Sequence, residues 1–161
     1  MRLIDGEIPD KISNMLKNQK LVIATAESCT GGLIAHTLTN ISGSSEYFDR
    51  GIVSYSNRAK MELLDVPENI LKKHGAVSME VAKIMAKSVR IKSNVDIGIS
   101  TTGIAGPTGG SKDRPVGLVF IAVSTERNIV VKKIYFSGDR SKNKKNTCDA
   151  ALDMLLDVLT R

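Results

Sequence analysis

The stretch LVIATAESCTGGLIAHTLTNI, residues 21–41, contains the pattern that decides the fold class. Its first six residues are an apolar run with β-branched side chains, which is typical of a buried strand. Two glycines, Gly31 and Gly32, follow, and the apolar residues beyond them recur at helical spacing. This segment is therefore predicted to run from strand through turn to helix, the repeating unit of α/β domains.

The same change from strand to helix recurs further along the chain. The run RGIVSYS at 50–56 predicts a second strand, and Asn57 is the expected N-cap of the helix after it. A third strand is predicted at 95–102, after a long helix whose expected N-cap is Ser78. Apolar residues at helical spacing predict helices at 8–19, 33–41, 57–64 and 78–93 and in the segment after 140.

Two further apolar runs, 116–124 and 128–136, are separated by a short polar link and predict an antiparallel hairpin. Strands that alternate with helices, together with this hairpin, predict a three-layer α/β/α sandwich with a mixed, mostly parallel sheet and one antiparallel hairpin. The chain has 161 residues and no recognisable linker, so residues 1–161 are expected to form a single domain.

The composition is that of an ordinary folded protein, with 42% hydrophobic and 25% charged residues. No apolar run approaches the roughly 18–20 residues of a membrane span, and the first residues lack the apolar core of a signal peptide. A cytoplasmic protein without a membrane partner is therefore expected.

The two cysteines, Cys29 and Cys148, are too few for a disulfide framework, and no Cys/His spacing resembles a zinc site. Neither a metal nor a cofactor is expected.

The formal net charge of +6 favours contact with phosphate groups. Proteins that bind single-stranded nucleic acid usually add aromatic stacking platforms, and this chain has no Trp and only three Tyr and three Phe. A small anionic ligand would explain the charge equally well, so no specific nucleic acid is expected as a partner.

Ser28 is the first candidate for catalysis. It lies between a predicted strand end and a predicted helix start, where unpaired N–H groups and the helix dipole favour negative charge. The backbone N–H groups of Cys29, Thr30 or Gly31 would then be placed to stabilise an oxyanion. Ordinary capping and turn formation account for the same serine, threonine and glycines, so both interpretations stay open.

A nucleophilic serine needs a base, and Lys60 is the candidate. It falls in the first turn of a predicted helix, where a partly buried ammonium has a lowered pKa and a neutral amine can accept a proton. Tyr55, at the preceding strand end, is placed to hydrogen-bond this pair. A solvated surface lysine is the alternative. The two histidines, His36 and His74, are interpreted as structural.

Two segments are candidates for binding an anion. The loop GIAGPTGG at 103–110 has glycines that allow close backbone approach and present N–H groups. A cationic cluster near the start of the last helix suggests a phosphate site, and it consists of Arg140, Lys142, Lys144 and Lys145. An ordinary surface loop and solvated lysines are the alternatives.

Taken together, six motifs closely resemble the CinA C-terminal domain family in order and spacing: AESCTGG at 26–32, YSNRAK at 55–60, GAVS at 75–78, TTGIAGPTGG at 101–110, PVG at 115–117 and GDR at 138–140. The resemblance extends from about residue 8 to the end of the chain. It implies a nicotinamide-nucleotide amidase, which hydrolyses the carboxamide of nicotinamide mononucleotide to nicotinic acid mononucleotide and ammonia in pyridine-nucleotide recycling.

The resemblance also implies roles for individual residues: Ser28 as nucleophile, Lys60 as its base and Tyr55 as an assisting residue. It further implies that Thr102 helps to hold the carboxamide or the lysine, and that Lys144 stands where relatives have an arginine. A lysine supplies a point charge rather than a bidentate fork, which weakens phosphate recognition. The expected substrate-binding residues are Thr30, Gly31, Gly32, Thr102, Gly103, Gly106, Arg140 and Lys144.

Longer members of the family carry an additional N-terminal domain that resembles molybdopterin-binding proteins, so this chain is expected to be the stand-alone form, acting on a pyridine mononucleotide as a homo-oligomer. The alternative is a catalytically idle, nucleotide-binding regulatory module of the same fold. A nucleic-acid-associated protein is a second alternative, against which the small number of aromatic residues argues.

Overall fold

Five strands form one mixed sheet in the computed structural model, which describes residues 7–161. The strands are β1 (Ile23–Glu27), β2 (Phe48–Val53), β3 (Ile97–Gly103), β4 (Leu118–Ser124) and β5 (Ile129–Tyr135). Their order across the sheet is β2-β1-β3-β4-β5. β1 pairs in parallel with β2 and β3, and β4 pairs antiparallel with β3 and β5, so only β4 runs against the others.

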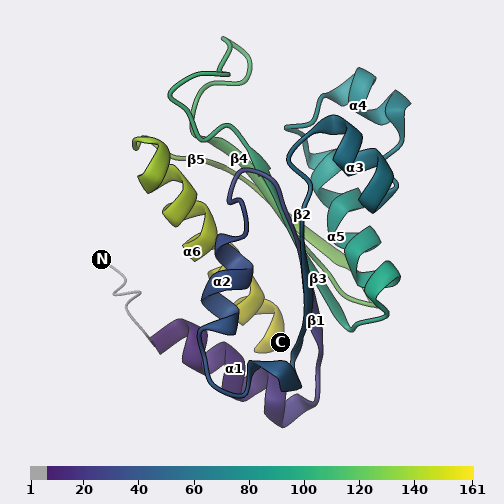
Figure 1. Ribbon diagram of the computed structural model, residues 1–161. Helices are drawn as coiled ribbons and strands as arrows, with labels where there is room; N and C mark the ends of the chain where they lie inside the picture. The colour runs from purple at the N-terminus through teal and green to yellow at the C-terminus, as the bar shows by residue number, and fades with distance from the viewer. Residues whose placement is uncertain (1–6) are drawn as a thin grey trace.

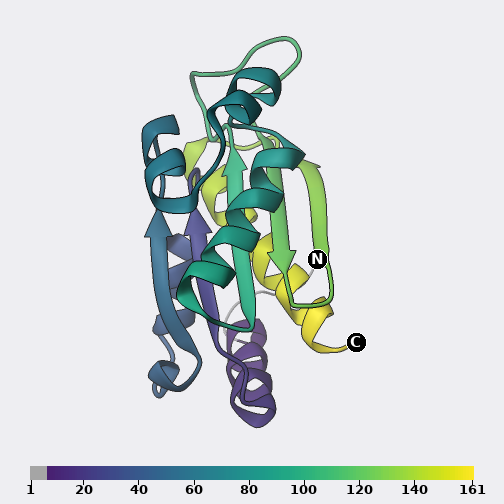
Figure 2. The same ribbon diagram turned by 90° about the vertical axis from the view of Figure 1, so that its right-hand side faces the viewer.

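Helices cover both faces of this sheet (Figure 1). One layer contains α1 (Glu7–Gln19), α2 (Leu33–Thr39) and α6 (Arg140–Leu159). The other contains α3 (Asn57–Leu64), α4 (Glu68–His74) and α5 (Met79–Ser93), which lie in front of the sheet in Figure 2. A short 3-10 helix, η1 (Ser44–Glu46), precedes β2. The predicted three-layer α/β/α sandwich with its mixed, mostly parallel sheet is confirmed.

The central strands are buried because helices cover them on both faces. Every residue of β1 is buried, and its alternate side chains enter different cores. Ile23 packs in the core with α1, α2 and α6, whereas Ala24 and Ala26 pack in the core beneath α5. Gly98 on β3 lets α5 approach closely, because a Cβ there would lie 2.1 Å from the carbonyl oxygen of Ala86.

Three details differ from the sequence-based expectations. β2 spans residues 48–53 rather than 50–56, because the chain leaves the strand at Ser54 and turns into α3. The N-cap of α3 is Ser56 rather than Asn57, since the Ser56 hydroxyl accepts from the N–H of Ala59 at 3.0 Å. β3 and β4 are also antiparallel, so the loop at 104–117 joins neighbouring strands.

The carboxyl ends of β1, β2 and β3 meet at one end of the molecule, at the top of Figures 1 and 2. The start of α6 and the projecting loop between β3 and β4 lie at the same end. This is where parallel α/β sheets usually hold their ligands. Among residues 7–161, no helix combines the length and the apolar character needed to cross a bilayer.

Candidate active site at the carboxyl ends of the parallel strands

Ser28 and Lys60, 32 residues apart in the sequence, are in direct contact. Ser28 directly follows β1, and its N–H donates to the carbonyl of Thr101 on β3 at 3.0 Å. Lys60 lies in the first turn of α3, and its Nζ donates to the Ser28 Oγ at 3.1 Å. Both residues are buried, with 8% and 1% of their surfaces exposed. Lys60 is therefore not a solvated surface lysine.

The end of β2 orients the Lys60 amine. Nζ donates to the carbonyl oxygens of Ser54 at 2.7 Å and of Tyr55 at 3.4 Å. A neutral amine has two hydrogens and one lone pair, so these carbonyls can take both hydrogens and leave the lone pair directed at the Ser28 hydroxyl. Within residues 7–161, no carboxylate forms an ion pair with Lys60. This geometry suits an amine that accepts a proton from serine.

Burial lowers the pKa of Lys60 to about 8 from its usual 10.5, because the ammonium loses its hydration. Any negative charge on nearby Cys29 would raise this pKa, an effect smaller than that of burial. Burial also raises the pKa of Cys29 itself to about 11, so this thiol stays protonated near neutral pH. Of these two adjacent nucleophilic side chains, only the serine is hydrogen-bonded to a base within residues 7–161.

Tyr55 lies near the pair in a different way from the one expected. Its carbonyl accepts from Lys60, but its side chain is 59% exposed and its hydroxyl accepts from Nη2 of Arg140 at 2.8 Å. The expected hydrogen bond from this hydroxyl to the serine–lysine pair is not formed within the described chain. The reason is the alternation of extended backbone, which buries Ser54 and directs Tyr55 outward.

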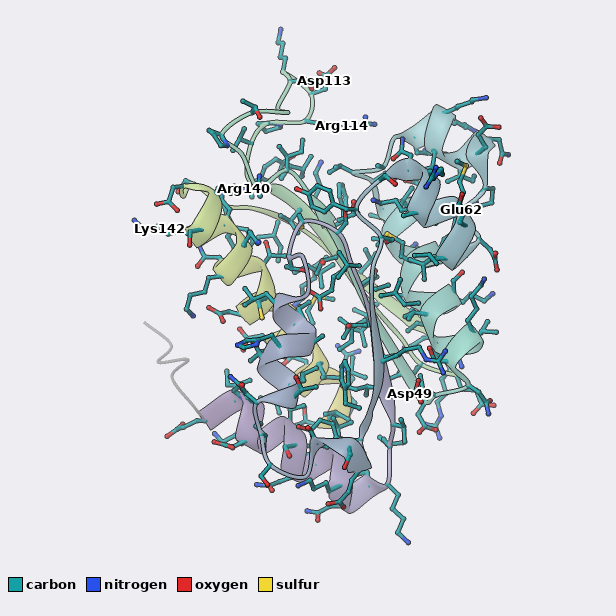
Figure 3. The ribbon with its side chains drawn as sticks, viewed as in Figure 1. Asp49, Glu62, Asp113, Arg114, Arg140 and Lys142 are labelled. Carbon is teal, nitrogen blue, oxygen red and sulfur yellow. The ribbon has the colours of Figure 1, made fainter. Side chains whose placement is uncertain are left out.

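The start of α6 holds the glycine-rich loop. Arg140 donates from Nη1 to the Gly106 carbonyl at 2.7 Å, and Asn143 donates from Nδ2 to the Ala105 carbonyl at 3.0 Å. Figure 3 shows Arg140 and Lys142 at this helix start, below the loop that carries Asp113 and Arg114. At these two positions the loop presents carbonyl oxygens to cationic or amide donors, rather than the N–H groups expected to bind an anion.

The far side of the loop between β3 and β4, residues 104–117, is attached to the other helical layer. Arg114 donates from Nη2 to the carbonyl of His74, the last residue of α4. Gly75 makes room for this contact, because it has a φ of +75° and a Cβ there would lie 2.4 Å from Nη1 of Arg114. The loop therefore connects α6 with α4 across the end of the sheet.

Packing explains two of the residues that were expected to bind substrate. The Thr102 hydroxyl donates to the Ala76 carbonyl at 2.8 Å and so holds the connection between α4 and α5. Gly103 allows β4 to pair closely, because a Cβ there would lie 2.7 Å from Cγ2 of Val119. A contact of either residue with substrate stays a prediction.

A hollow of about 1030 Å³ lies between α2 and α6. Five of the expected substrate-binding residues line it: Thr30, Gly31, Gly32, Arg140 and Lys144. Ser28 and Lys60 do not line it, and the hollow adjoins them through the turn at 28–32. Exposed His36 also lines it, so the structural role expected for this histidine is not supported by burial.

Gly31 and Gly32 are required by the backbone of this turn. Their φ angles are +61° and +98°, in the left-handed region that side chains disfavour. Lys144 lies over the turn, since a Cβ on Gly31 would be 3.5 Å from its Nζ. Two buried residues beside the turn, Glu27 and Thr101, were not among the predicted site residues. The signal for Glu27 was present: an acidic residue that ends an otherwise apolar strand.

No group of three or more His, Cys, Asp or Glu residues in the described part of the chain is arranged to hold a metal ion.

The fold and the site together define an α/β/α protein with a buried serine–lysine pair at the carboxyl ends of its parallel strands. The family model for the CinA C-terminal domain matches residues 5–159, and the chain belongs to this family.

Relatives agree with this assignment. A CinA-like protein of Syntrophus aciditrophicus is 51% identical over 152 residues, which are 94% of this chain and 36% of that protein. The chain thus spans a little over a third of the length of the curated relatives it matches.

Two solved structures have the same fold. The competence/damage inducible protein CihA from Agrobacterium tumefaciens is 40% identical, with a TM-score of 0.93 and all of both chains covered. A competence or damage-inducible protein from Enterobacter asburiae is 34% identical, with a TM-score of 0.92 and 96% and 97% of the two chains covered.

Proposed function

We propose that this protein is a serine amidohydrolase that converts nicotinamide mononucleotide to nicotinic acid mononucleotide and ammonia in pyridine-nucleotide recycling. The observation that carries the proposal is the buried contact of 3.1 Å between Lys60 Nζ and Ser28 Oγ. Membership of the CinA family supports it, because the sequence motifs that resemble this family include both residues. A serine beside a lysine of lowered pKa is a known arrangement for acyl transfer.

The first half of the reaction forms an acyl-enzyme. Neutral Lys60 takes the hydroxyl proton of Ser28, and Oγ attacks the carboxamide carbon of the substrate. The tetrahedral intermediate collapses as the C–N bond breaks, and the Lys60 ammonium returns the proton so that ammonia leaves. The N–H groups of Cys29 and Thr30 are candidates for stabilising the oxyanion, because they have no oxygen acceptor within residues 7–161.

The second half releases the acid. Neutral Lys60 takes a proton from water, the hydroxide attacks the ester carbon, and the proton passes to Ser28 Oγ as the ester C–O bond breaks. The product leaves as nicotinic acid mononucleotide, whose new carboxylic acid releases its proton to solvent to become a carboxylate. The two carbonyls of Ser54 and Tyr55 keep the amine in place through both halves. No metal or cofactor takes part in this scheme.

The substrate phosphate is assigned to the hollow between α2 and α6. Arg140 and Lys144 line it from the start of α6, and the Gly31–Gly32 turn forms the side next to Ser28. This placement offers a use for the cationic cluster. A cytoplasmic location and a homo-oligomeric state remain predictions.

Ammonia release from nicotinamide mononucleotide tests the proposal, with a chelator present. The purified protein is compared with Ser28→Ala and Lys60→Met, and Lys72→Met serves as the matched control because Lys72 is 72% exposed on α4 and pairs with Glu68. Turnover in the parent and the control, but in neither dyad variant, is expected. A folded parent protein that melts at higher temperature with the nucleotide but releases no ammonia would instead support the idle regulatory module.

A further inference from the structure

Glu27, the last residue of β1, is a buried carboxylate with no direct part in the proposed reaction. The residue is 1% exposed, and no Lys, Arg or His forms an ion pair with it within residues 7–161. Burying a carboxylate is costly unless other groups compensate for the lost hydration. The compensation here comes from neutral donors.

Five donors surround the two carboxylate oxygens at 2.6–3.3 Å: the hydroxyls of Thr25 and Thr30 and the backbone N–H groups of Gly32, Ile34 and Ala35. The three N–H groups belong to the start of α2, where the helix dipole also favours a negative charge. Glu27 therefore occupies the position that a ligand phosphate takes in many nucleotide-binding α/β proteins. A substrate anion must be held elsewhere, which agrees with the cations of α6.

These hydrogen bonds also control the turn that carries Ser28. Thr30 joins Glu27 to β3, because its hydroxyl lies 2.6 Å from Oε2 and 2.8 Å from the Thr101 hydroxyl. The N–H of Gly31 donates to the Ser28 carbonyl at 3.1 Å, which closes the turn. Glu27 and Ser28 are adjacent, yet their side chains contact different helical layers, α2 for the carboxylate and α3 for the hydroxyl.

We propose that Glu27 is a positioning residue whose carboxylate fixes the turn at 28–32, so that Ser28 Oγ stays in line with the Lys60 amine. The inference rests on the proposed serine chemistry. Loss of the hydrogen bonds to the Glu27 carboxylate displaces the Ser28 hydroxyl without removing any reacting group. A displacement of about 1 Å can slow a reaction by roughly 100-fold.

Glu27→Gln tests this role, because it keeps the size of the side chain but replaces one acceptor oxygen with an NH2 group that faces the same donors. The matched control is Ser78→Ala, which removes the side-chain N-cap of α5 and touches neither Ser28 nor Lys60. Both variants are expected to melt at lower temperature than the parent. The first readout is the rate at which a sulfonyl fluoride labels Ser28, and the second is kcat and KM for nicotinamide mononucleotide.

We expect Glu27→Gln to lower the labelling rate and kcat by about ten-fold to 100-fold, with KM changed far less. The pH at which labelling reaches half its plateau should stay near the parent value, because the base is unchanged. Ser78→Ala should label at the parent rate. Parent-like labelling in folded Glu27→Gln would overturn the proposal and leave Glu27 a stabilising residue only. Labelling needs no amide turnover, so failure of the amidase proposal is recognised separately, by the absence of ammonia.

Discussion

Arg140 donates from its guanidinium to the hydroxyl of Tyr55 across 2.8 Å, and this bond joins the start of α6 to the end of β2, 85 residues away in the sequence. The same guanidinium donates to the Gly106 carbonyl at 2.7 Å. Three separate segments therefore meet at one side chain beside the hollow that is assigned to the substrate phosphate. The Tyr55 hydroxyl thus contacts Arg140, and only its backbone carbonyl contacts the serine–lysine pair within residues 7–161.

Tyr55→Phe is expected to raise KM for nicotinamide mononucleotide several-fold and to leave kcat nearly unchanged. The substitution removes one of the two acceptors that orient Arg140 but touches neither Ser28 Oγ nor Lys60 Nζ. Steady-state kinetics measure both constants. A collapse of kcat at constant KM would instead assign the Tyr55 hydroxyl a role in proton transfer.

The pH dependence of kcat/KM should follow Lys60. Only the neutral amine accepts the serine proton, and the pKa of this amine is lowered to about 8 by burial. Activity is therefore expected to rise about ten-fold per pH unit below this value and to level off above it. Lys60→Arg, which stays protonated, should be inactive throughout. A profile that is flat through this region would rule out Lys60 as the titrating base.

The same pKa shift makes a prediction about stability. The pKa is about 8 in the folded protein and 10.5 for the unperturbed side chain, so between these values the unfolded chain binds a proton that the folded protein lacks. Stability contributed by this group therefore rises with pH across the window. Relative to Lys60→Met, the parent should gain up to a few kcal/mol, because each pKa unit corresponds to about 1.4 kcal/mol.

Urea unfolding of the parent and Lys60→Met at several pH values across that window measures this difference. The other titrating groups are common to both proteins, so their contributions to the free energy of unfolding cancel in the difference. A difference that does not change with pH would mean that the buried lysine keeps an ordinary pKa.

Lys144 should determine affinity for the phosphate rather than the rate of the chemical step. Lys144→Ala is expected to raise KM several-fold with kcat retained, because its Nζ lies over the Gly31 turn and lines the hollow but contacts neither reacting group. Lys144→Arg should lower KM, since a guanidinium can bind a phosphate in bidentate fashion. Titration with inorganic phosphate as an inhibitor checks the assignment, and equal inhibition of all three proteins would contradict it.

Gly75→Ala should destabilise the protein and loosen the attachment of the loop between β3 and β4 to α4. Its backbone, with φ +75° and ψ 163°, lies in a region that only glycine adopts readily and costs an alanine about 1–3 kcal/mol, and the new Cβ would overlap the Arg114 guanidinium. Arg114→Ala in the same chain should recover only the part due to overlap. Thermal unfolding of the two single variants and the double variant separates these contributions, and full recovery would show that backbone strain is negligible.

Local sequence patterns were sufficient for most of the secondary structure. The helix with its N-cap at Ser78, the β4–β5 hairpin and the strand that leads to Ser28 all follow from contacts between near neighbours in the chain. Such contacts are set by the spacing of apolar residues and by capping chemistry, which a sequence displays directly. The family motifs also singled out Ser28 and Lys60, but as separate segments.

The tertiary structure alone decided how these segments meet. The strand order placed the ends of β1 and β2 side by side, and this adjacency buried Lys60, lowered its pKa and brought its amine to the serine. The same folding gave Tyr55 a partner on α6 and placed the Glu27 carboxylate at the start of α2. Desolvation and hydrogen bonding depend on which distant groups become neighbours, and residue types and their spacing do not specify those neighbours.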